Sequence, residues 1–144
     1  MNTLSTLSKE FIDKTRGYRF KNAKWDKSIQ ISITTLDNLI KSFGVPKFCK
    51  IDVEGSEFSV LLGLSTPVEY LSIEFVPEIK ENSIKSIDLL CKLSKDYVFN
   101  YSKEETLEFE LKDWMNKEDF INYINTIKLS PVTFGDIYAK LNRR

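Results

Sequence analysis

The amino-acid sequence predicts an α/β fold with a mostly parallel open sheet and an antiparallel hairpin near its end. Two observations lead to this prediction. Apolar residues recur with the period of a strand and then with the spacing of a helix face, and this alternation repeats three times before two final strand-like segments. Glycine and proline residues stand where most of these patterns stop. Crossovers through helices make the first three strands parallel.

The first two strand–helix pairs are expected in residues 29–64. Three isoleucines alternate with polar residues at 29–33, which is the pattern of a half-buried strand. Apolar residues at helical spacing follow at 36–43, and Gly44 ends that helix. A second strand is expected at 47–52, and the helix after it begins near Glu54.

The remaining elements are expected between residue 68 and the final segment. A third strand covers residues 68–75, and a helix follows at 84–94. Residues 97–101 and 106–111 are predicted to pair as an antiparallel hairpin, because a polar turn separates two strand-like runs. A last helix is expected at 120–127. The 144 residues fit one domain, which at this size buries about two-thirds of its unfolded surface.

The composition excludes several kinds of chemistry. The chain has no histidine, so it cannot form a Ser-His-Asp or Cys-His nucleophile pair or a zinc site that contains histidine. Its two cysteines, Cys49 and Cys91, are too few for a four-thiolate metal site or a disulfide framework. The 21 basic and 21 acidic residues leave no net charge. Proteins that bind nucleic acid through its phosphates usually carry a basic excess, so no nucleic-acid partner is expected.

Residues 1–27 are predicted to form an arm that is separate from the main body at 28–144. The arm is locally basic, with Tyr18, Phe20 and Trp25 among its lysines and arginines. Such a segment could bind single-stranded nucleic acid or an anionic ligand. The alternative, which we favour, is that its aromatic side chains pack on the main body.

A cytoplasmic location is the simplest expectation. Two cysteines without a disulfide framework suit a reducing compartment. No apolar run reaches the roughly 20 residues that a membrane span needs, so no span is expected. The first residues lack the continuous apolar core of a secretory signal.

Carboxylates gather at the predicted ends of two strands. In the stretch KFCKIDVEGSEF, residues 47–58, an apolar strand leads to Asp52, and Gly55 permits a tight turn toward the next helix, with Glu54 beside it. Glu74 holds a similar place at the end of the following strand. Open sheets bind ligands at the carboxyl ends of their strands. If the two strands are neighbours, Asp52, Glu54 and Glu74 converge on one pocket.

Helix electrostatics explain only part of this pattern. Acidic residues stabilise helix N-termini by about 0.3–1 kcal/mol each, which accounts for Glu57 and partly for Glu54. The same effect does not explain Asp52 beside a glycine turn, or Glu74 inside an apolar strand where an unpaired charge is costly. A functional role is therefore the better explanation for Asp52 and Glu74, and an even choice for Glu54.

The residues around this motif resemble a known family. The segment TTLDNLIKSFGVPKFCKIDVEGSEFSVLLGL, residues 34–64, closely resembles the signature region of FkbM-type methyltransferases. The strand LSIEF at 71–75 is similar to the family's next strand, and FGDIYAK at 134–140 resembles its closing segment. The resemblance spans residues 28–140, and the run KIDVEG at 50–55 is its most specific part.

The resemblance implies an enzyme that uses S-adenosylmethionine to methylate a hydroxyl group of a sugar or another small molecule. It also implies a Rossmann-like methyltransferase fold whose reversed last strand forms the late hairpin. Asp52 and Glu54 match the family's motif, and Glu74 ends the next strand. These three residues would act as the base, orient the acceptor hydroxyl, or hold a metal such as Mg²⁺. Crowding of like charges would raise the pKa of one of them.

The sequence departs from the family in its first half. The family's cofactor site needs a glycine-rich turn after the first strand, and no two glycines here form a GxG. The five glycines are Gly17, Gly44, Gly55, Gly63 and Gly135. The chain is therefore expected to correspond to the C-terminal half of the family domain, with weak or absent binding of S-adenosylmethionine.

Half of a doubly wound sheet would expose a strand edge, which favours pairing with another chain. We therefore expect a homodimer or a partner chain at that edge. Besides a methyltransferase with a small-molecule or glycan acceptor, a non-catalytic binding or assembly module derived from such a domain stays open. A sugar-binding protein unrelated to methylation has only the open-sheet architecture in its favour.

Overall fold

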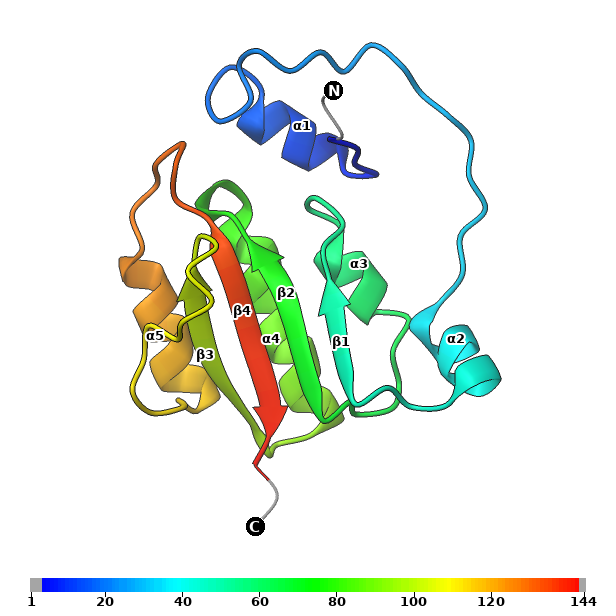
Figure 1. The fold of residues 1–144 in the computed structure, drawn as a ribbon, viewed down its shortest axis with the longest axis vertical. Helices are drawn as coiled ribbons and strands as arrows, with labels where there is room; N and C mark the ends of the chain where they lie inside the picture. Colours follow the sequence, from blue (N-terminus) through cyan, green and yellow to red (C-terminus); the bar gives the residue numbers. More distant parts are fainter. Residues whose placement is uncertain (1–3, 143–144) are drawn as a thin grey trace.

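The centre of the protein is a four-stranded open sheet with the strand order β1-β2-β4-β3 (Figure 1). The computed structural model describes residues 4–142. The strands are β1 (Phe48–Ile51), β2 (Tyr70–Phe75), β3 (Tyr97–Lys103) and β4 (Gly135–Leu141). β1 and β2 are parallel, and β4 is antiparallel to both β2 and β3. Three strands thus run in one direction and the last strand is reversed, which confirms an α/β fold with a mixed open sheet.

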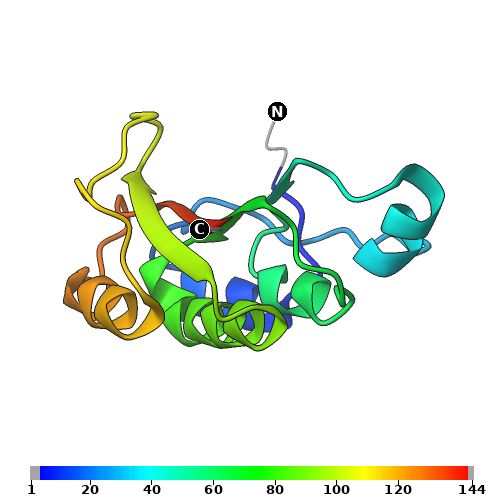
Figure 2. The same ribbon diagram turned by 90° about the horizontal axis from the view of Figure 1, so that it is seen from below.

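Five α-helices and one short 3₁₀ helix are present in the described part of the chain. They are α1 (Lys9–Thr15), α2 (Leu36–Phe43), α3 (Glu57–Leu61), η1 (Pro77–Ile79), α4 (Lys80–Leu93) and α5 (Lys117–Thr126). Helices α3, α4 and α5 lie side by side on one face of the sheet (Figure 2). No helix among residues 4–142 is long and apolar enough to cross a membrane.

The main hydrophobic core lies between the sheet and these three helices. In β2, every second residue, Leu71, Ile73 and Phe75, is buried in this core. Successive side chains of a strand point to opposite faces, so Ser72 and Glu74 lie on the other face of the sheet. This alternation is what brings Glu74 out of the core although it belongs to an apolar strand.

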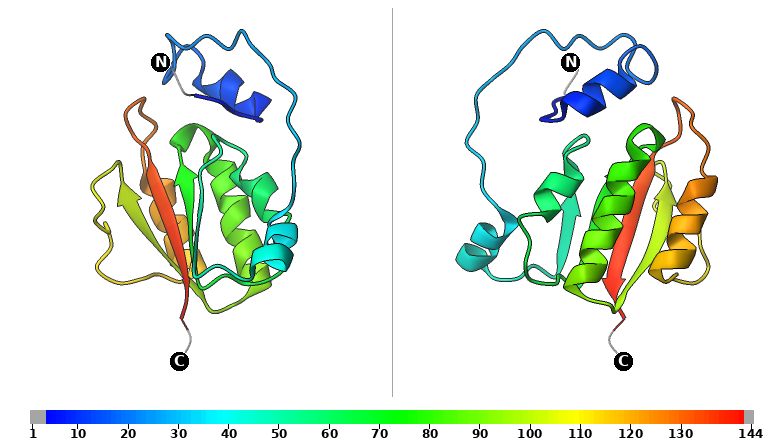
Figure 3. Two further views of the ribbon diagram at one scale, coloured as in Figure 1. Left: turned by 45° about the vertical axis from the view of Figure 1, so that its right-hand side comes forward. Right: turned by 180° about the vertical axis from the view of Figure 1, so that it is seen from behind.

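A second, smaller core attaches the N-terminal arm to the body. Phe11 of α1 is fully buried against Val76 and Ile79, and Phe20 and Trp25 pack around them. The arm and α1 lie over the carboxyl ends of β1 and β2 (Figure 3). The expectation that the aromatic side chains of the arm pack on the main body is confirmed for Phe20 and Trp25, whereas Tyr18 is 40% exposed.

The strand predicted at residues 29–33 is not formed. These residues are extended but unpaired, and Ile29, Ile31 and Ile33 are 86%, 52% and 80% exposed. The alternating pattern predicted a half-buried strand, which is wrong on both pairing and burial. A strand needs a neighbour for its N–H and C=O groups, and none of the four described strands lies beside this segment.

The predicted hairpin between residues 97–101 and 106–111 is also wrong. The first segment is part of β3, but the second is not a strand. It is held to β3 by the side chain of Asn100, which donates to the Leu111 carbonyl and accepts from the Leu111 N–H (2.9 and 3.2 Å). The antiparallel partner of β3 is β4, which follows more than 30 residues later. A local turn signal could not reveal this long-range pairing.

Candidate active site at the ends of two parallel strands

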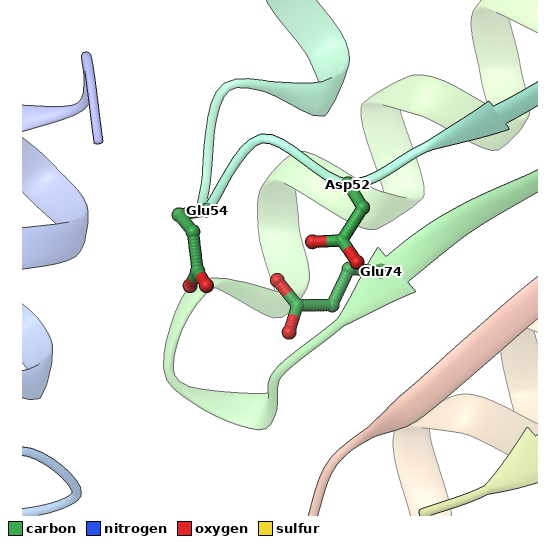
Figure 4. A group of neighbouring side chains, drawn as sticks. All are labelled: Asp52, Glu54 and Glu74. Atoms are coloured by element: carbon green, nitrogen blue, oxygen red, sulfur yellow. The ribbon is translucent and has the colours of Figure 1, made fainter. Parts of the chain in front are cut away.

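Three carboxylates meet at the carboxyl ends of β1 and β2. Ile51 of β1 pairs with Ile73 of β2, so the next residues, Asp52 and Glu74, lie side by side. One carboxylate oxygen from each of Asp52, Glu54 and Glu74 lies within 4.8 Å of the others. Figure 4 shows the three side chains around a shared space, with Glu54 opposite the other two. The predicted convergence of these residues is confirmed as a matter of geometry.

The turn after β1 turns Glu54 back toward the strand ends. Glu54 and Gly55 both have positive φ, at 53° and 91°. The Glu54 carbonyl accepts a hydrogen bond from the hydroxyl of Thr6 at 2.6 Å, so the arm holds this strained residue in place. Helix α3 begins at Glu57, not near Glu54 as expected. Glu54 therefore belongs to the turn and receives no stabilisation as a first-turn helix residue.

Gly55 is required by its surroundings as well as by its φ. A Cβ atom at this position would lie 2.7 Å from the Cβ of Phe11, which is closer than side chains pack. The ring of Phe11 therefore rests directly on the backbone of the turn. Helix α1 covers this side of the carboxylate site and leaves no room over Gly55.

Glu57 organises the same turn from inside the protein. Its side chain is buried, and Oε1 accepts hydrogen bonds from the N–H groups of Val53 and Gly55 at 3.2 and 3.1 Å. Burial raises the pKa of Glu57, and the bonds from the backbone N–H groups oppose that rise. From the sequence, Glu57 was explained only by the stabilisation that an acidic side chain gives to a helix N-terminus. The short spacing from Gly55 to Glu57 is the signal that could have indicated its bonds to the turn.

Burial in the site favours the uncharged carboxyl form of Glu54 and Glu74 and so raises the pKa of both. Burial raises the pKa of Glu74 to about 8, and the negative charges of Glu54 and Asp52 add to this rise. Burial also raises the pKa of Glu54, followed by the charges of Asp52 and Glu57, whereas the charge of Arg19 lowers it. The expectation that crowding raises one pKa has the right direction, but burial is the larger cause.

A lysine and a fourth carboxylate complete the polar surroundings. The Lys50 ammonium lies 3.1 Å from both carboxylate oxygens of Asp136 and 3.6 Å from Oδ2 of Asp52. Asp136 pairs with Glu74 across β2 and β4. Sequence reasoning missed both residues. Lys50 stands two residues before Asp52 and therefore on the same strand face, which could have indicated that it lies near the site. Asp136 is on a strand far away in sequence, so no local pattern could have indicated it.

The arrangement can perform two kinds of chemistry. A carboxyl group with a pKa near the working pH can accept a proton from a bound hydroxyl group, and its neighbours can orient that hydroxyl. Three carboxylate oxygens at this spacing are also ligands of the type that Mg²⁺ or Ca²⁺ prefers.

Comparison of the chain with protein-family models gives a match. The family model described as the methyltransferase FkbM domain matches residues 3–120. The match therefore includes the arm and the carboxylate site, and it ends before the closing segment at 134–140. No curated protein matches the sequence.

Proposed function

Since the chain belongs to the FkbM methyltransferase domain family, we propose that its carboxylate site is the acceptor side of a methyltransferase. The acceptor is a hydroxyl group of a sugar or of another small molecule, and the methyl donor of such a family is S-adenosylmethionine. The observation that carries the proposal is the convergence of Asp52, Glu54 and Glu74 at the ends of two parallel strands.

Methylation of a hydroxyl group requires that its proton leaves as the new C–O bond forms. A chain without histidine must use another base, and carboxylates are suitable. Glu74, with a pKa raised to about 8, gains basic character as the pH rises toward that value. Asp52 lies beside the Lys50 ammonium and is more exposed, which suits it to orient the hydroxyl.

The topology supports a Rossmann-like methyltransferase fold. Three strands run in the same direction, and the final strand, β4, is inserted in reverse between β2 and β3. A reversed last strand is the feature that the family resemblance implies. The ligand side of such an open sheet is the carboxyl end of its parallel strands, where the carboxylates lie.

The described residues do not fit S-adenosylmethionine. A dinucleotide-type cradle needs a glycine-rich turn whose backbone N–H groups face the ligand. The turn after β1 is covered by Phe11 at Gly55, and the N–H groups of Val53 and Gly55 already donate to Glu57. We therefore assign the acceptor side alone to these residues and place no donor contact on them.

The covered turn after β1 also favours a second candidate function. A binding or assembly module derived from a methyltransferase domain would keep the fold and the carboxylate site without turnover. The occupied turn at Gly55 supports it. A reducing, cytoplasmic location stays a prediction for either function.

Methyl transfer from S-adenosylmethionine to a panel of sugars and small alcohols tests the two functions. Product is measured by mass spectrometry at high cofactor concentration. Because no donor site is placed on the described residues, we expect slow product formation that rises linearly with cofactor concentration and does not saturate. Asp52→Asn should lower this rate by at least about tenfold, because removal of an acid–base or orienting group has effects of this size or larger.

Glu108→Gln is the matched control, since Glu108 is an exposed carboxylate outside the site, and it should keep the natural rate. Absence of methylated product from every acceptor, with the protein folded, would contradict the enzyme and favour the binding module. Full activity of Asp52→Asn would remove Asp52 from the site.

A further inference from the structure

The side of the molecule beyond β1 exposes much apolar surface. We call it the β1-side surface and define it by residues 29–33, Leu39, Phe43, Val45 and Phe48, all of whose large apolar side chains are exposed. Figures 1 and 3 show the extended segment and α2 on this same side of the sheet. Phe43, at the end of α2, is 85% exposed.

An apolar cavity opens beside this surface. It has a volume of about 190 Å³ and lies between α2 and β1, with Leu36, Ile40, Phe43 and Cys49 among its lining residues. A cavity of this kind can take up apolar side chains from outside. The β1-side surface thus has a cavity that can bind apolar side chains, in addition to its own exposed apolar side chains.

The accessible surface of the protein is larger than that of a compact monomer of the same mass. Its accessible surface is 9508 Å². A compact monomer of 16.8 kDa exposes about 7,700 Å², so the excess is about 1,800 Å². A standard protein interface buries roughly 800 Å² on each partner. The excess is therefore large enough for a stable interface.

The β1-side surface contains an open strand edge and an unpaired extended segment that could pair with such an edge. β1 is at the edge of the described sheet, with β2 as its one neighbour in that sheet, so its outer N–H and C=O groups are open to a further strand. Residues 28–34 are uncharged, extended and unpaired, and their isoleucines alternate with polar residues. Such a segment is suited to add to a sheet edge. Within one chain the two do not pair.

We propose that a second copy of this chain occupies the β1-side surface, with residues 28–34 of each copy pairing with β1 of the other. The exchange is reciprocal, so one interface satisfies both copies and closes as a two-fold dimer. The isoleucines of each segment then lie against α2 and the apolar cavity of the partner. The formal net charge of zero means that no overall repulsion opposes association of identical chains.

The proposal is tested by sedimentation velocity and light scattering over a wide range of protein concentrations. We expect a dimer at high concentration. Ile31→Lys, which places a charge on the apolar side of the segment, should weaken association by at least about tenfold. Gln30→Lys is the matched control, because it adds the same charge to an exposed neighbour on the polar side, and it should change association little.

Hydrogen exchange distinguishes this interface from others. With rising protein concentration, the amides of residues 29–33 and 48–51 should exchange more slowly. A monomer at every concentration overturns the proposal and leaves the surface to a different protein. A dimer that Ile31→Lys does not weaken, or whose residues 29–33 gain no protection, also overturns it.

Discussion

Glu74 is a carboxyl group that the fold keeps protonated near neutral pH. Burial raises its pKa from 4.5 to about 8, and the neighbouring carboxylates Glu54, Asp52 and Glu57 contribute to the rise. Between these two pH values the folded protein holds a proton that the unfolded chain has released. The free energy of unfolding therefore falls as the pH rises from 4.5 to about 8.

Replacement of Glu74 by Gln should remove this pH dependence. We expect Glu74→Gln to be more stable than the natural protein above pH 8, by up to about 5 kcal/mol for a rise in pKa from 4.5 to about 8, and to differ little below pH 4.5. Urea unfolding at several pH values measures the difference. Glu108→Gln serves as the exposed control. Equal pH slopes for natural protein and Glu74→Gln would mean that Glu74 is ionised in the folded state.

At the scale of elements, a buried ion pair joins the arm to the body. Nε and Nη2 of Arg19 donate to the two carboxylate oxygens of Glu78 at 2.9 and 3.0 Å, and both side chains are almost fully buried. Nη2 also donates to the carbonyls of Ser130 and Thr133. Nε has one N–H bond and Nη2 has two, so these three donors serve four acceptors and one N–H of Nη2 is shared between two of them. Arg19 thus connects the arm, η1 and the segment before β4.

Loss of this arginine should release the arm. Arg19→Met leaves the Glu78 carboxylate buried without its partner, and we expect a loss of about 3–5 kcal/mol in the free energy of unfolding. The double variant Arg19→Met/Glu78→Met removes both charges and should recover much of that loss. Chemical denaturation measures all three proteins.

Arg16→Met is the control, because Arg16 is an exposed arginine of the same arm. Limited proteolysis gives a second measurement: cleavage within residues 22–35 should become faster in Arg19→Met and stay unchanged in Arg16→Met. A double variant no more stable than Arg19→Met would show that the pair stabilises by itself and not through the cost of an unpaired charge.

At the scale of the whole molecule, the carboxylate site lies under the arm and not in an open cofactor crevice. Phe11 covers Gly55, and Glu57 uses the N–H groups of the turn. Each of these contacts stabilises the fold, and each also removes a group that a cofactor would need. Under the proposed function, the described residues therefore supply the acceptor side and no donor contact.

Calorimetric titration with S-adenosylmethionine measures this separation. We expect no saturable binding up to about 1 mM, which corresponds to a binding free energy weaker than about −4 kcal/mol. Circular dichroism of the same sample shows whether the protein is folded. Binding with micromolar affinity would mean that the described residues, or the arm after moving away from Gly55, do form a donor site.

The sequence by itself determined most local elements and the three carboxylates that meet at the candidate site. Helices at Leu36–Phe43 and Lys117–Thr126 and the strands at Phe48–Ile51 and Tyr70–Phe75 follow from apolar periodicity within about ten residues, and glycine or proline near their ends. Asp52 and Glu74 were found because strand ends of a parallel pair lie at one edge. These features depend on neighbours in sequence, which a pattern records.

Only the tertiary structure decided which segments pair and which groups meet across the chain. It gave β3 the distant partner β4, left residues 29–33 without a neighbour, and placed Lys50 beside Asp136. It also turned Glu57 inward to the turn at Gly55. Each of these outcomes depends on contacts between residues far apart in sequence, or on the direction of one side chain. Local periodicity carries no information about long-range contacts or about the direction of a single side chain. The interactions that select them form only when the sheet and the arm pack together.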